Sequence, residues 1–330
     1  MTWKDEIIHL SSVDIEDHSF RITTEENIES LSCSIRNAGL INHPIVIRKK
    51  SGYAVISGFR RIRSAVNLGW TNISVRTIKS DTGRFECAKL AIADNSLQRQ
   101  LNLIEISRCY KLLSEFFKGD DLLGEALLIG LPGNPALAEK IMRLVDLPPV
   151  IQNCVISETV SLAMAFELGE IGHETGIAFA EIFDELKPSL NKQREILSLS
   201  SEIAAREDIP VADLIKGDDC RNIISDENTD RNRKIQRIRH YLKTRRFPTI
   251  MKAEDNFRRN VKKLALTGGI KLIPPADFEG NTFIISMEFK TTAEFGELTA
   301  CLNRLAKDPV LKEIVSKNLS DSEHPLSGIL

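Results

Sequence analysis

Two adjacent arginines follow a glycine in SGFRRIRSA, residues 57–65. A strand-like YAVI precedes them and apolar residues at helical spacing follow, so Gly58 is expected at a sharp strand-to-helix turn. Cations are unfavourable at a helix N-terminus, by about 0.3–1 kcal/mol each, because that end of the helix dipole is already positive. A bound anion would reverse the sign. Gly58, Arg60 and Arg61 therefore predict a phosphate site, and an ordinary solvated amphipathic helix is the alternative.

A second candidate surface is the basic block of residues 231–263. It holds thirteen Lys/Arg and two acidic residues, a net charge of +11, in a chain whose overall charge is −2. Such a block is the electrostatic footprint of a nucleic-acid partner. The residues that we expect to contact DNA from this block are Arg237, Lys243, Arg245 and Arg246. The alternative is a solvated helix, since Ile235, Ile238 and Leu242 repeat at helical spacing and leave the charges outward.

The elements that must position the arginines alternate between strand and helix over residues 1–118. Gly39 stops a helical stripe, and Gly52 lies in a predicted hairpin turn. Asn102 begins a helix as its N-cap with Glu105 three residues later, the arrangement of a capping box. The strands that we expect are residues 7–10, 44–48, 53–56 and 73–77. This region is predicted to be an α/β domain.

The rest of the chain is predicted to form three further parts. Residues 119–215 have a helical pattern throughout. Residues 216–230 lack apolar periodicity and are expected to be a linker. Residues 231–330 begin with the basic helices and end in a small α+β unit, with a half-buried strand at 283–289 and a helix capped by Thr292.

The composition fits a globular protein, with 42% hydrophobic and 27% charged residues. No apolar run approaches the ~18 residues of a membrane span, and the first residues lack the apolar stretch of a secretory signal. We expect a cytoplasmic, nucleoid-associated protein that does not contact membranes. The six cysteines are scattered and predict neither disulfides nor a zinc site, so we expect them to be buried apolar residues.

Three stretches together resemble the N-terminal domain of the ParB family of partition proteins, whose fold is shared with sulfiredoxin. They are SIRNAGLINHPIVIRKK (34–50), YAVISGFRRIRSAVNLGW (53–70) and ADNSLQRQLNLIEISRCYKLL (93–113). The resemblance covers residues 5–117 and continues less clearly to about 170, where a family member carries a helix-turn-helix. It implies a ParB/sulfiredoxin-like α/β domain, an all-α middle domain and a small C-terminal domain.

The resemblance also implies a ligand and partners. Family members bind CTP with Mg²⁺, and nucleotide and DNA together close a homodimer into a clamp around DNA. By this resemblance Gly58, Arg60 and Arg61 would hold phosphates, Asp94 would be the carboxylate near Mg²⁺, and Asn95 would be a polar partner. Arg99 is a further phosphate candidate, and a surface arginine is the alternative.

The sequence departs from the family pattern at two places within this domain. Phe59 stands where the family has the Glu of GERR, which argues against efficient hydrolysis, so any CTPase activity is expected to be weak. Sulfiredoxin activity is excluded because it needs a cysteine at that position. Asn42 and His43 replace a single Gln of the family. The resemblance therefore predicts phosphate binding more firmly than it predicts which nucleotide is bound. We expect His43 and His173 to be structural or surface residues.

A third departure lies in the predicted reading helix, residues 134–145. Only Lys140 and Arg143 supply positive charge there, whereas DNA-reading helices usually present several polar or basic groups. A helix-turn-helix that contacts DNA through these two residues and a purely structural helix pair both remain open.

The main functional hypothesis is a ParB-like, nucleotide-binding, DNA-associated homodimer with a role in partition or transcription regulation. One alternative is a small nucleotide-dependent enzyme on the same fold, a kinase or a nuclease. Another is a degenerate family member that serves as an interaction scaffold.

Overall fold

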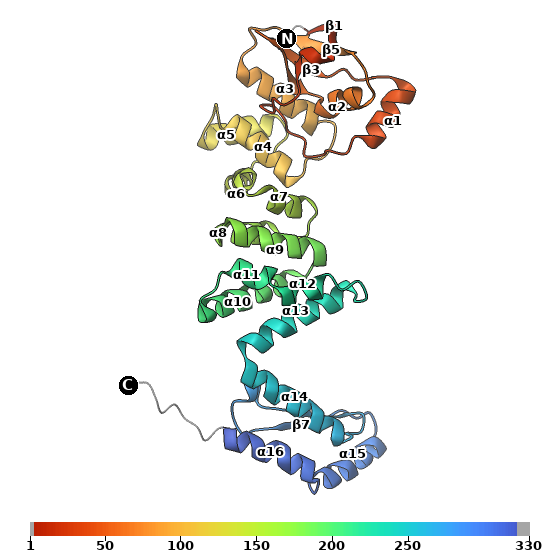
Figure 1. The fold of residues 1–330 in the computed structure, drawn as a ribbon, viewed down its shortest axis with the longest axis vertical. Coiled ribbons are helices and arrows are strands. Elements are labelled where there is room, and N and C mark those ends of the chain that lie inside the picture. Colours follow the sequence, from red (N-terminus) through yellow and green to blue (C-terminus); the bar gives the residue numbers. More distant parts are fainter. Residues whose placement is uncertain (1–2, 322–330) are drawn as a thin grey trace, which may run out of the picture. The chain divides into compact units, whose positions relative to one another are not determined.

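The computed structural model describes residues 3–321 and divides into two compact units. Unit 1 ends at Leu190 and unit 2 begins at Asn191 (Figure 1). The domain boundaries that the sequence predicts at 118, 215 and 230 stay predictions. Among the described residues, no helix combines the length and the hydrophobicity that a membrane crossing needs.

Unit 1 begins with a mixed five-stranded sheet in the order β1-β5-β3-β4-β2. The strands are β1 (Trp3–His9), β2 (Val13–Asp14), β3 (Ile45–Lys49), β4 (Gly52–Ser57) and β5 (Asn72–Ile78). β3 and β4 pair antiparallel as the predicted hairpin, which confirms that expectation. The sequence pattern missed β2, because only two of its residues pair, in parallel with β4. Val46, Val55 and Val75 are buried at the centre of the sheet core.

Helices of the α/β region follow the strands and carry the residues singled out by the sequence. They are α1 (Glu29–Ala38), α2 (Phe59–Asn67), α3 (Arg84–Ser96) and α4 (Leu103–Leu113), and a 3₁₀ turn spans Leu10–Ser12. Ile62 and Ala65 of α2 pack into the sheet core, so the opposite face of this helix stays outside. Asn102 and Glu105 form the predicted capping box at the start of α4.

The second half of unit 1 is helical. It contains α5 (Gly119–Leu128), α6 (Pro135–Met142), α7 (Pro149–Ile156), α8 (Leu162–Glu170) and α9 (His173–Leu186). The helix predicted for residues 134–145 ends earlier, at Met142, and continues as a 3₁₀ turn over Arg143–Asp146. Asn134 caps α6 by accepting the N–H of Leu137.

Unit 2 begins with five helices, and one of them corrects the sequence prediction. Its helices are α10 (Leu190–Glu207), α11 (Val211–Lys216), α12 (Asp218–Ile224), α13 (Arg231–Arg246), α14 (Pro248–Lys263), α15 (Thr292–Leu305) and α16 (Pro309–Asp321). The predicted linker at 216–230 was wrong over α12, which buries Cys220 and Ile223. Two apolar residues three positions apart are enough to anchor a helix of this length, yet too few to produce a periodic signal.

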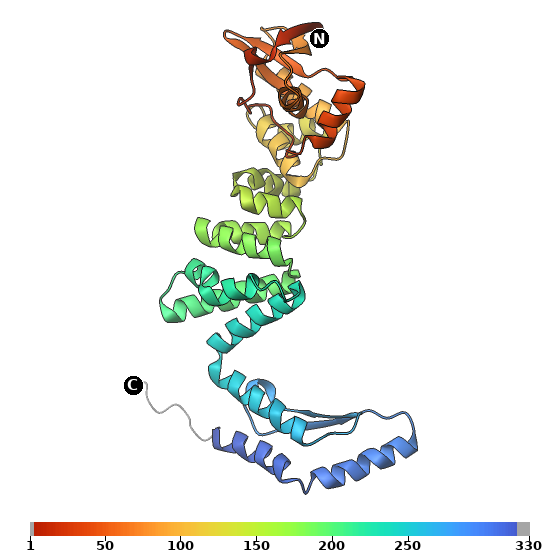
Figure 2. The same cartoon turned by 45° about the vertical axis from the view of Figure 1, so that its right-hand side comes forward.

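The last part of unit 2 packs two strands against helices (Figure 2). β6 (Ile270–Ile273) pairs antiparallel with β7 (Ile284–Met287), and a 3₁₀ turn at Ala276–Phe278 lies between them. The predicted alternation of buried and exposed residues along 283–289 was wrong, because Ile284 and Ile285 are both exposed. A two-stranded sheet buries less than a wider sheet does. The cap of α15 is Thr291, one residue before the predicted Thr292.

All six cysteines are free thiols. Five are buried as expected, and burial raises the pKa of Cys87, Cys109, Cys154 and Cys220. Cys33 is the exception, because it lies on the exposed face of α1. The prediction of burial was wrong for that residue.

Candidate functional site

The turn between β4 and α2 is built around Gly58. This residue caps α2 with a φ of 93°, in the left-handed region that favours glycine. A Cβ at this position would lie 2.9 Å from Pro44 Cβ and 3.0 Å from Pro44 Cα. The first turn of α2 contains no acidic residue and no side-chain cap, so Arg60 and Arg61 stand at an uncompensated helix N-terminus. The predicted strand-to-helix turn at Gly58 is confirmed, and the phosphate site stays a prediction.

Replacing Gly58 by Ala is expected to destabilise unit 1 by about 2–4 kcal/mol, because strain at positive φ adds to the clash with Pro44. Gly69→Ala is the matched control, since Gly69 has a φ of 74° and nothing within 4 Å of a built Cβ. That variant should lose only about 1 kcal/mol. Urea unfolding followed by tryptophan fluorescence measures both. Equal losses would contradict the role assigned to Pro44.

Arg61 and Asp94 lie together in the structure although 33 residues separate them. Arg61 donates one N–H to Asp94 Oδ2 at 3.2 Å and another to the carbonyl oxygens of Asn42 and His43, each at 3.1 Å. The hydroxyl of Ser57 donates to the same Asp94 oxygen, and Gln98 donates to Oδ1 at 2.8 Å. The carboxylate is therefore surrounded by donors on both oxygens.

Arg60 contacts the segment just before α1. Its Nη2 donates to the carbonyl oxygen of Asn27 at 2.7 Å. Its Nε is buried and has no hydrogen-bond partner within the described residues. A buried donor without a partner costs about 1–3 kcal/mol, so an acceptor supplied by a ligand would be favourable there. Asn95 donates through Nδ2 to the carbonyl oxygen of Ala91 at 2.7 Å, which fixes its amide on α3.

Two adjoining cavities contain these side chains. The smaller, of about 250 Å³, is lined by Gly58, Arg60, Arg61, Asp94, Asn95, Gln98 and Arg99, together with Ile22, Thr23, Leu31, Asn42, Ser57 and Phe59. The larger, of about 1000 Å³, extends from residues 18–27 to α7. Arg60 and Arg99 line both cavities. The structure thus brings together all six residues that the sequence predicts for the nucleotide and its metal.

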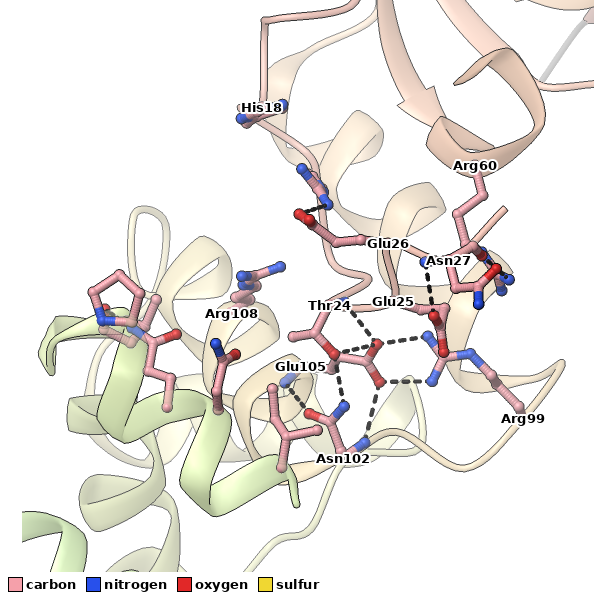
Figure 3. A pocket seen from close by; sticks show the side chains of 16 residues that line it. His18, Thr24, Glu25, Glu26, Asn27, Arg60, Arg99, Asn102, Glu105 and Arg108 are labelled. Carbon is pink, nitrogen blue, oxygen red and sulfur yellow. Dashed lines mark hydrogen bonds and ion pairs between the residues drawn. The ribbon is translucent and has the colours of Figure 1, made fainter. Parts of the chain in front are cut away.

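Arg99 is not a free cation in this arrangement (Figure 3). It forms two parallel hydrogen bonds with Glu105, at 2.6 and 2.7 Å. Glu105 is 1% exposed and also accepts the N–H groups of Thr24 and Asn102. Burial alone would raise the pKa of Glu105, but these donors outweigh it and hold the pKa below its usual range. Glu105 therefore links α4 to the segment at residue 24 and holds Arg99 in place.

Two further arginines line the larger cavity and were missed at the sequence level. Arg108 donates to the carbonyl oxygens of Ile22 and Thr23, at 3.3 and 2.8 Å, and burial followed by the nearby Arg21 lowers its pKa. Arg21 pairs with Glu26 at 3.0 Å, and its Nε is buried without a partner within the described residues. The sequence signal that could have identified Arg108 is its spacing from Glu105, because residues three positions apart lie on one face of α4.

The structure also shows where the residues that depart from the family pattern lie. Phe59 is 8% exposed and belongs to the sheet core, with its ring edge-on to His18. The position of the family's Glu is therefore filled by packed hydrocarbon. His43 faces Asp5 at 3.6 Å, consistent with a structural or surface histidine.

No group of three or more His, Cys, Asp or Glu side chains gathers into a metal-binding arrangement among residues 3–321. Asp94 remains the one predicted metal ligand, and Mg²⁺ often takes only one or two protein carboxylates beside phosphate oxygens and water. A single hard oxygen ligand next to the candidate phosphate site fits that chemistry.

The residues predicted to contact DNA lie in two places. Lys140 and Arg143 lie at the C-terminal end of α6 and just after it, and the other four lie on α13. Lys140 and Arg143 are exposed, and the Arg143 guanidinium lies 5.2 Å from the ring centre of Phe166. The four α13 residues all form ion pairs inside unit 2. The pairs are Arg237 with Asp226, Lys243 with Glu195, Arg245 with Glu207 and Arg246 with Glu202. The sequence could not show that acidic side chains of unit 2 neutralise part of the basic block.

Residues 4–95 match the ParB N-terminal domain. A nucleoid occlusion protein of Bacillus cereus (strain AH187) is 28% identical over 225 residues, covering 61% of this chain and 75% of the relative. Its counterpart in Geobacillus kaustophilus (strain HTA426) is 32% identical over 164 residues, covering 48% and 56%.

Similar solved structures include two of the C-terminally truncated chromosome-partitioning protein ParB from Caulobacter crescentus. The one complexed with CTP-gamma-S is 23% identical, covers 55% of this chain and 99% of that chain, and has a TM-score of 0.25. The one complexed to the centromeric parS site is 21% identical, covers 57% and 96%, and has a TM-score of 0.32. Scores of this size do not establish a shared arrangement of domains. Residues 4–95 are therefore a ParB N-terminal domain, and the similarity to nucleoid occlusion proteins extends beyond that domain.

Proposed function

We propose that this protein is a DNA-associated homodimer that binds CTP with Mg²⁺ at the two adjoining cavities. One observation carries the nucleotide claim. Arg60 and Arg61 meet Asp94 and Asn95 around one cavity at a helix N-terminus, and Arg99, held by Glu105, lines the same cavity. Several arginines are needed to neutralise a triphosphate, and the carboxylate suits its metal. The curated relatives are named nucleoid occlusion proteins, which supports a role on DNA.

Each residue of the site would have its own role in binding the nucleotide. Gly58 leaves the backbone of the turn open to phosphate oxygens, and Arg60 offers its unpartnered Nε–H. Arg61 already meets a carboxylate oxygen at Asp94, and it would share its N–H groups with phosphate oxygens in the same way. Mg²⁺ would supply charge neutralisation beside Asp94. Phe59 provides no carboxylate to orient a water molecule, so the chemistry of this chain favours binding over hydrolysis.

Isothermal titration of the full chain with CTP, ATP and GTP, each with Mg²⁺, tests the nucleotide claim. We expect heat of binding with CTP and weaker or no heat with the two purine nucleotides. A folded protein that gives no heat with any of the three would contradict the proposal. Phosphate release measured in the same samples should stay close to the background.

DNA contact is proposed for two parts of the chain. Lys140 and Arg143 are exposed at the C-terminal end of α6 and just beyond it, and the packing of α5 against α6 supports a helix-turn-helix. The basic helix α13 would add contacts that do not depend on base sequence. Phosphate contacts of this kind release counterions, so affinity should fall steeply with salt.

A further inference from the structure

The side chains of helix α13, which is labelled in Figure 1, form three distinct faces. Ile235, Ile238 and Leu242 are buried and form the face that anchors the helix. A second face carries Arg239, Lys243 and Arg246, which pair with acidic residues of α10. The third face borders a groove of about 1010 Å³ between α12 and α13. The thirteen cations of the basic block are therefore not equivalent.

The cations that face α10 are held in place. Glu195 accepts a hydrogen bond from Arg239 at 2.7 Å and pairs with Lys243 at 2.9 Å. Burial would raise the pKa of Glu195, yet the two cations lower it on balance. Glu202 holds Arg246 at 2.7 Å in the same manner. Partly buried pairs that join two helices are more costly to break than exposed ones, so these cations serve packing.

Arg245 marks the boundary between the two faces. It lines the groove, but Glu207 accepts two of its N–H groups, at 2.5 and 3.0 Å, and the Tyr241 hydroxyl meets a third. The hydrogen bonds from Arg245 and then Arg206 lower the pKa of Glu207 to about 2. A guanidinium with this many partners is poorly placed to bind an external anion.

Arg233 and Arg237 differ because they lie on the open side of the groove. Their side chains are 76% and 49% exposed. Their partners, Asp230 at 3.5 Å and Asp226 at 2.5 Å, both lie in the short segment between α12 and α13. The Arg233–Asp230 pair is exposed on both sides and contributes about 0–1 kcal/mol. Asp226 is only 27% exposed, but it lies in the segment between the two helices, so neither arginine is paired with a residue of α10.

Neutral and titratable donors stand beside these two arginines. Gln236, His240 and Thr244 also line the groove, and Asp219 is its one acidic lining residue. Side chains of these types commonly bind the phosphates of nucleic acids, where they position the duplex without reading bases. The charge and the donors of the groove are complementary to a phosphate backbone.

We propose that the α12–α13 groove binds the phosphate backbone of duplex DNA, independently of base sequence, chiefly through Arg233 and Arg237. This assignment rests on the proposed association with DNA and narrows it to one face of one helix. It replaces Lys243, Arg245 and Arg246 as the expected contacts, because those three are bound to acidic residues of α10.

The test compares two double variants of the full chain by fluorescence anisotropy with labelled duplexes of two unrelated sequences. Arg233→Gln/Arg237→Gln should weaken binding to both duplexes about tenfold at low salt and reduce the magnitude of the log–log salt slope by about two. Arg239→Gln/Lys243→Gln, on the α10 face, should leave affinity within about twofold while lowering the thermal midpoint.

A third variant controls for net charge alone. Lys307→Gln/Lys312→Gln removes the same two charges from exposed positions near the start and in the first turn of α16 and should bind DNA like the unmodified chain. If the unmodified chain binds neither duplex, the DNA part of the proposed function fails. If it binds and the groove variant binds equally well, or if the net-charge control loses as much affinity, only the groove assignment is overturned.

Discussion

Replacing both Arg60 and Arg61 by Gln is expected to lower the affinity for CTP by at least about 100-fold. A hydrogen bond to a charged group contributes about 1.5–3 kcal/mol, and two such residues therefore account for at least about 3 kcal/mol. The loss should be large because both side chains line the cavity at the same helix end. Isothermal titration with CTP and Mg²⁺ measures it.

Arg63→Gln is the matched control for that experiment. Arg63 lies on the same helix, is exposed and lines neither cavity. Its replacement should leave the dissociation constant within about twofold, because the general charge of the helix contributes little at physiological salt. A double variant that stays folded and still binds CTP within threefold of the unmodified chain would show that phosphates lie elsewhere.

Glu105→Ala is expected to destabilise unit 1 by about 3 kcal/mol. The substitution removes a buried carboxylate, leaves Arg99 without its partner, and orphans the backbone N–H groups of Thr24 and Asn102. Arg99 is 40% exposed and can recover some hydration, which places the expected loss at the low end for a broken buried pair. Both tryptophans, Trp3 and Trp70, lie in unit 1, so urea unfolding followed by their fluorescence reports this unit.

The pH dependence of this effect has a definite sign. The pKa of Glu105 is lower in the folded state than its ordinary value of about 4.3. Its charged form therefore contributes stability that is fully present at neutral pH and is lost as the pH falls through the folded-state pKa. The difference in unfolding free energy between the unmodified chain and the Glu105→Ala variant should shrink below about pH 4.

Lys111→Gln provides the comparison on the same helix. Lys111 pairs with Asp146 at 3.1 Å, and both side chains are more than half exposed. Its loss should cost less than about 1 kcal/mol and should show little change with acid. If Glu105→Ala were no more harmful than Lys111→Gln, the link between α4 and residue 24 would not be structural.

Local chemistry was readable from the sequence wherever neighbouring residues decide the structure. Gly58 at a strand-to-helix turn, the hairpin around Gly52 and the capping box of Asn102 and Glu105 all appear as predicted. Each depends on backbone preferences or on a hydrogen bond spanning three residues. Such features need no knowledge of how distant segments pack.

The rest of the site depends on segments that only the fold brings together. Glu105 was predicted as a cap, but its bonds to Thr24 span 81 residues. Arg99 was predicted to be available to phosphate, and the same carboxylate holds it. A capping pattern specifies one donor to the carboxylate, the N–H of Asn102, and leaves its other partners, here Arg99 and Thr24, undetermined.

The basic block illustrates the same limit at larger scale. Its charge is evident from composition, and the apolar spacing of Ile235, Ile238 and Leu242 gave the buried face correctly. Which cations face solvent depends on Glu195 and Glu202 of α10, about 40 residues earlier in the chain. Composition locates an electropositive segment, whereas packing decides which part of it can meet a partner.

The exposure of Cys33 offers a practical route to following the ligand. Because the other five thiols are buried, a maleimide dye should attach at one place without any engineered cysteine. α1 packs against α2, the helix that carries Arg60 and Arg61. A fluorophore attached to Cys33 would lie on the helix next to α2, so its emission should change when a nucleotide binds in the candidate pocket.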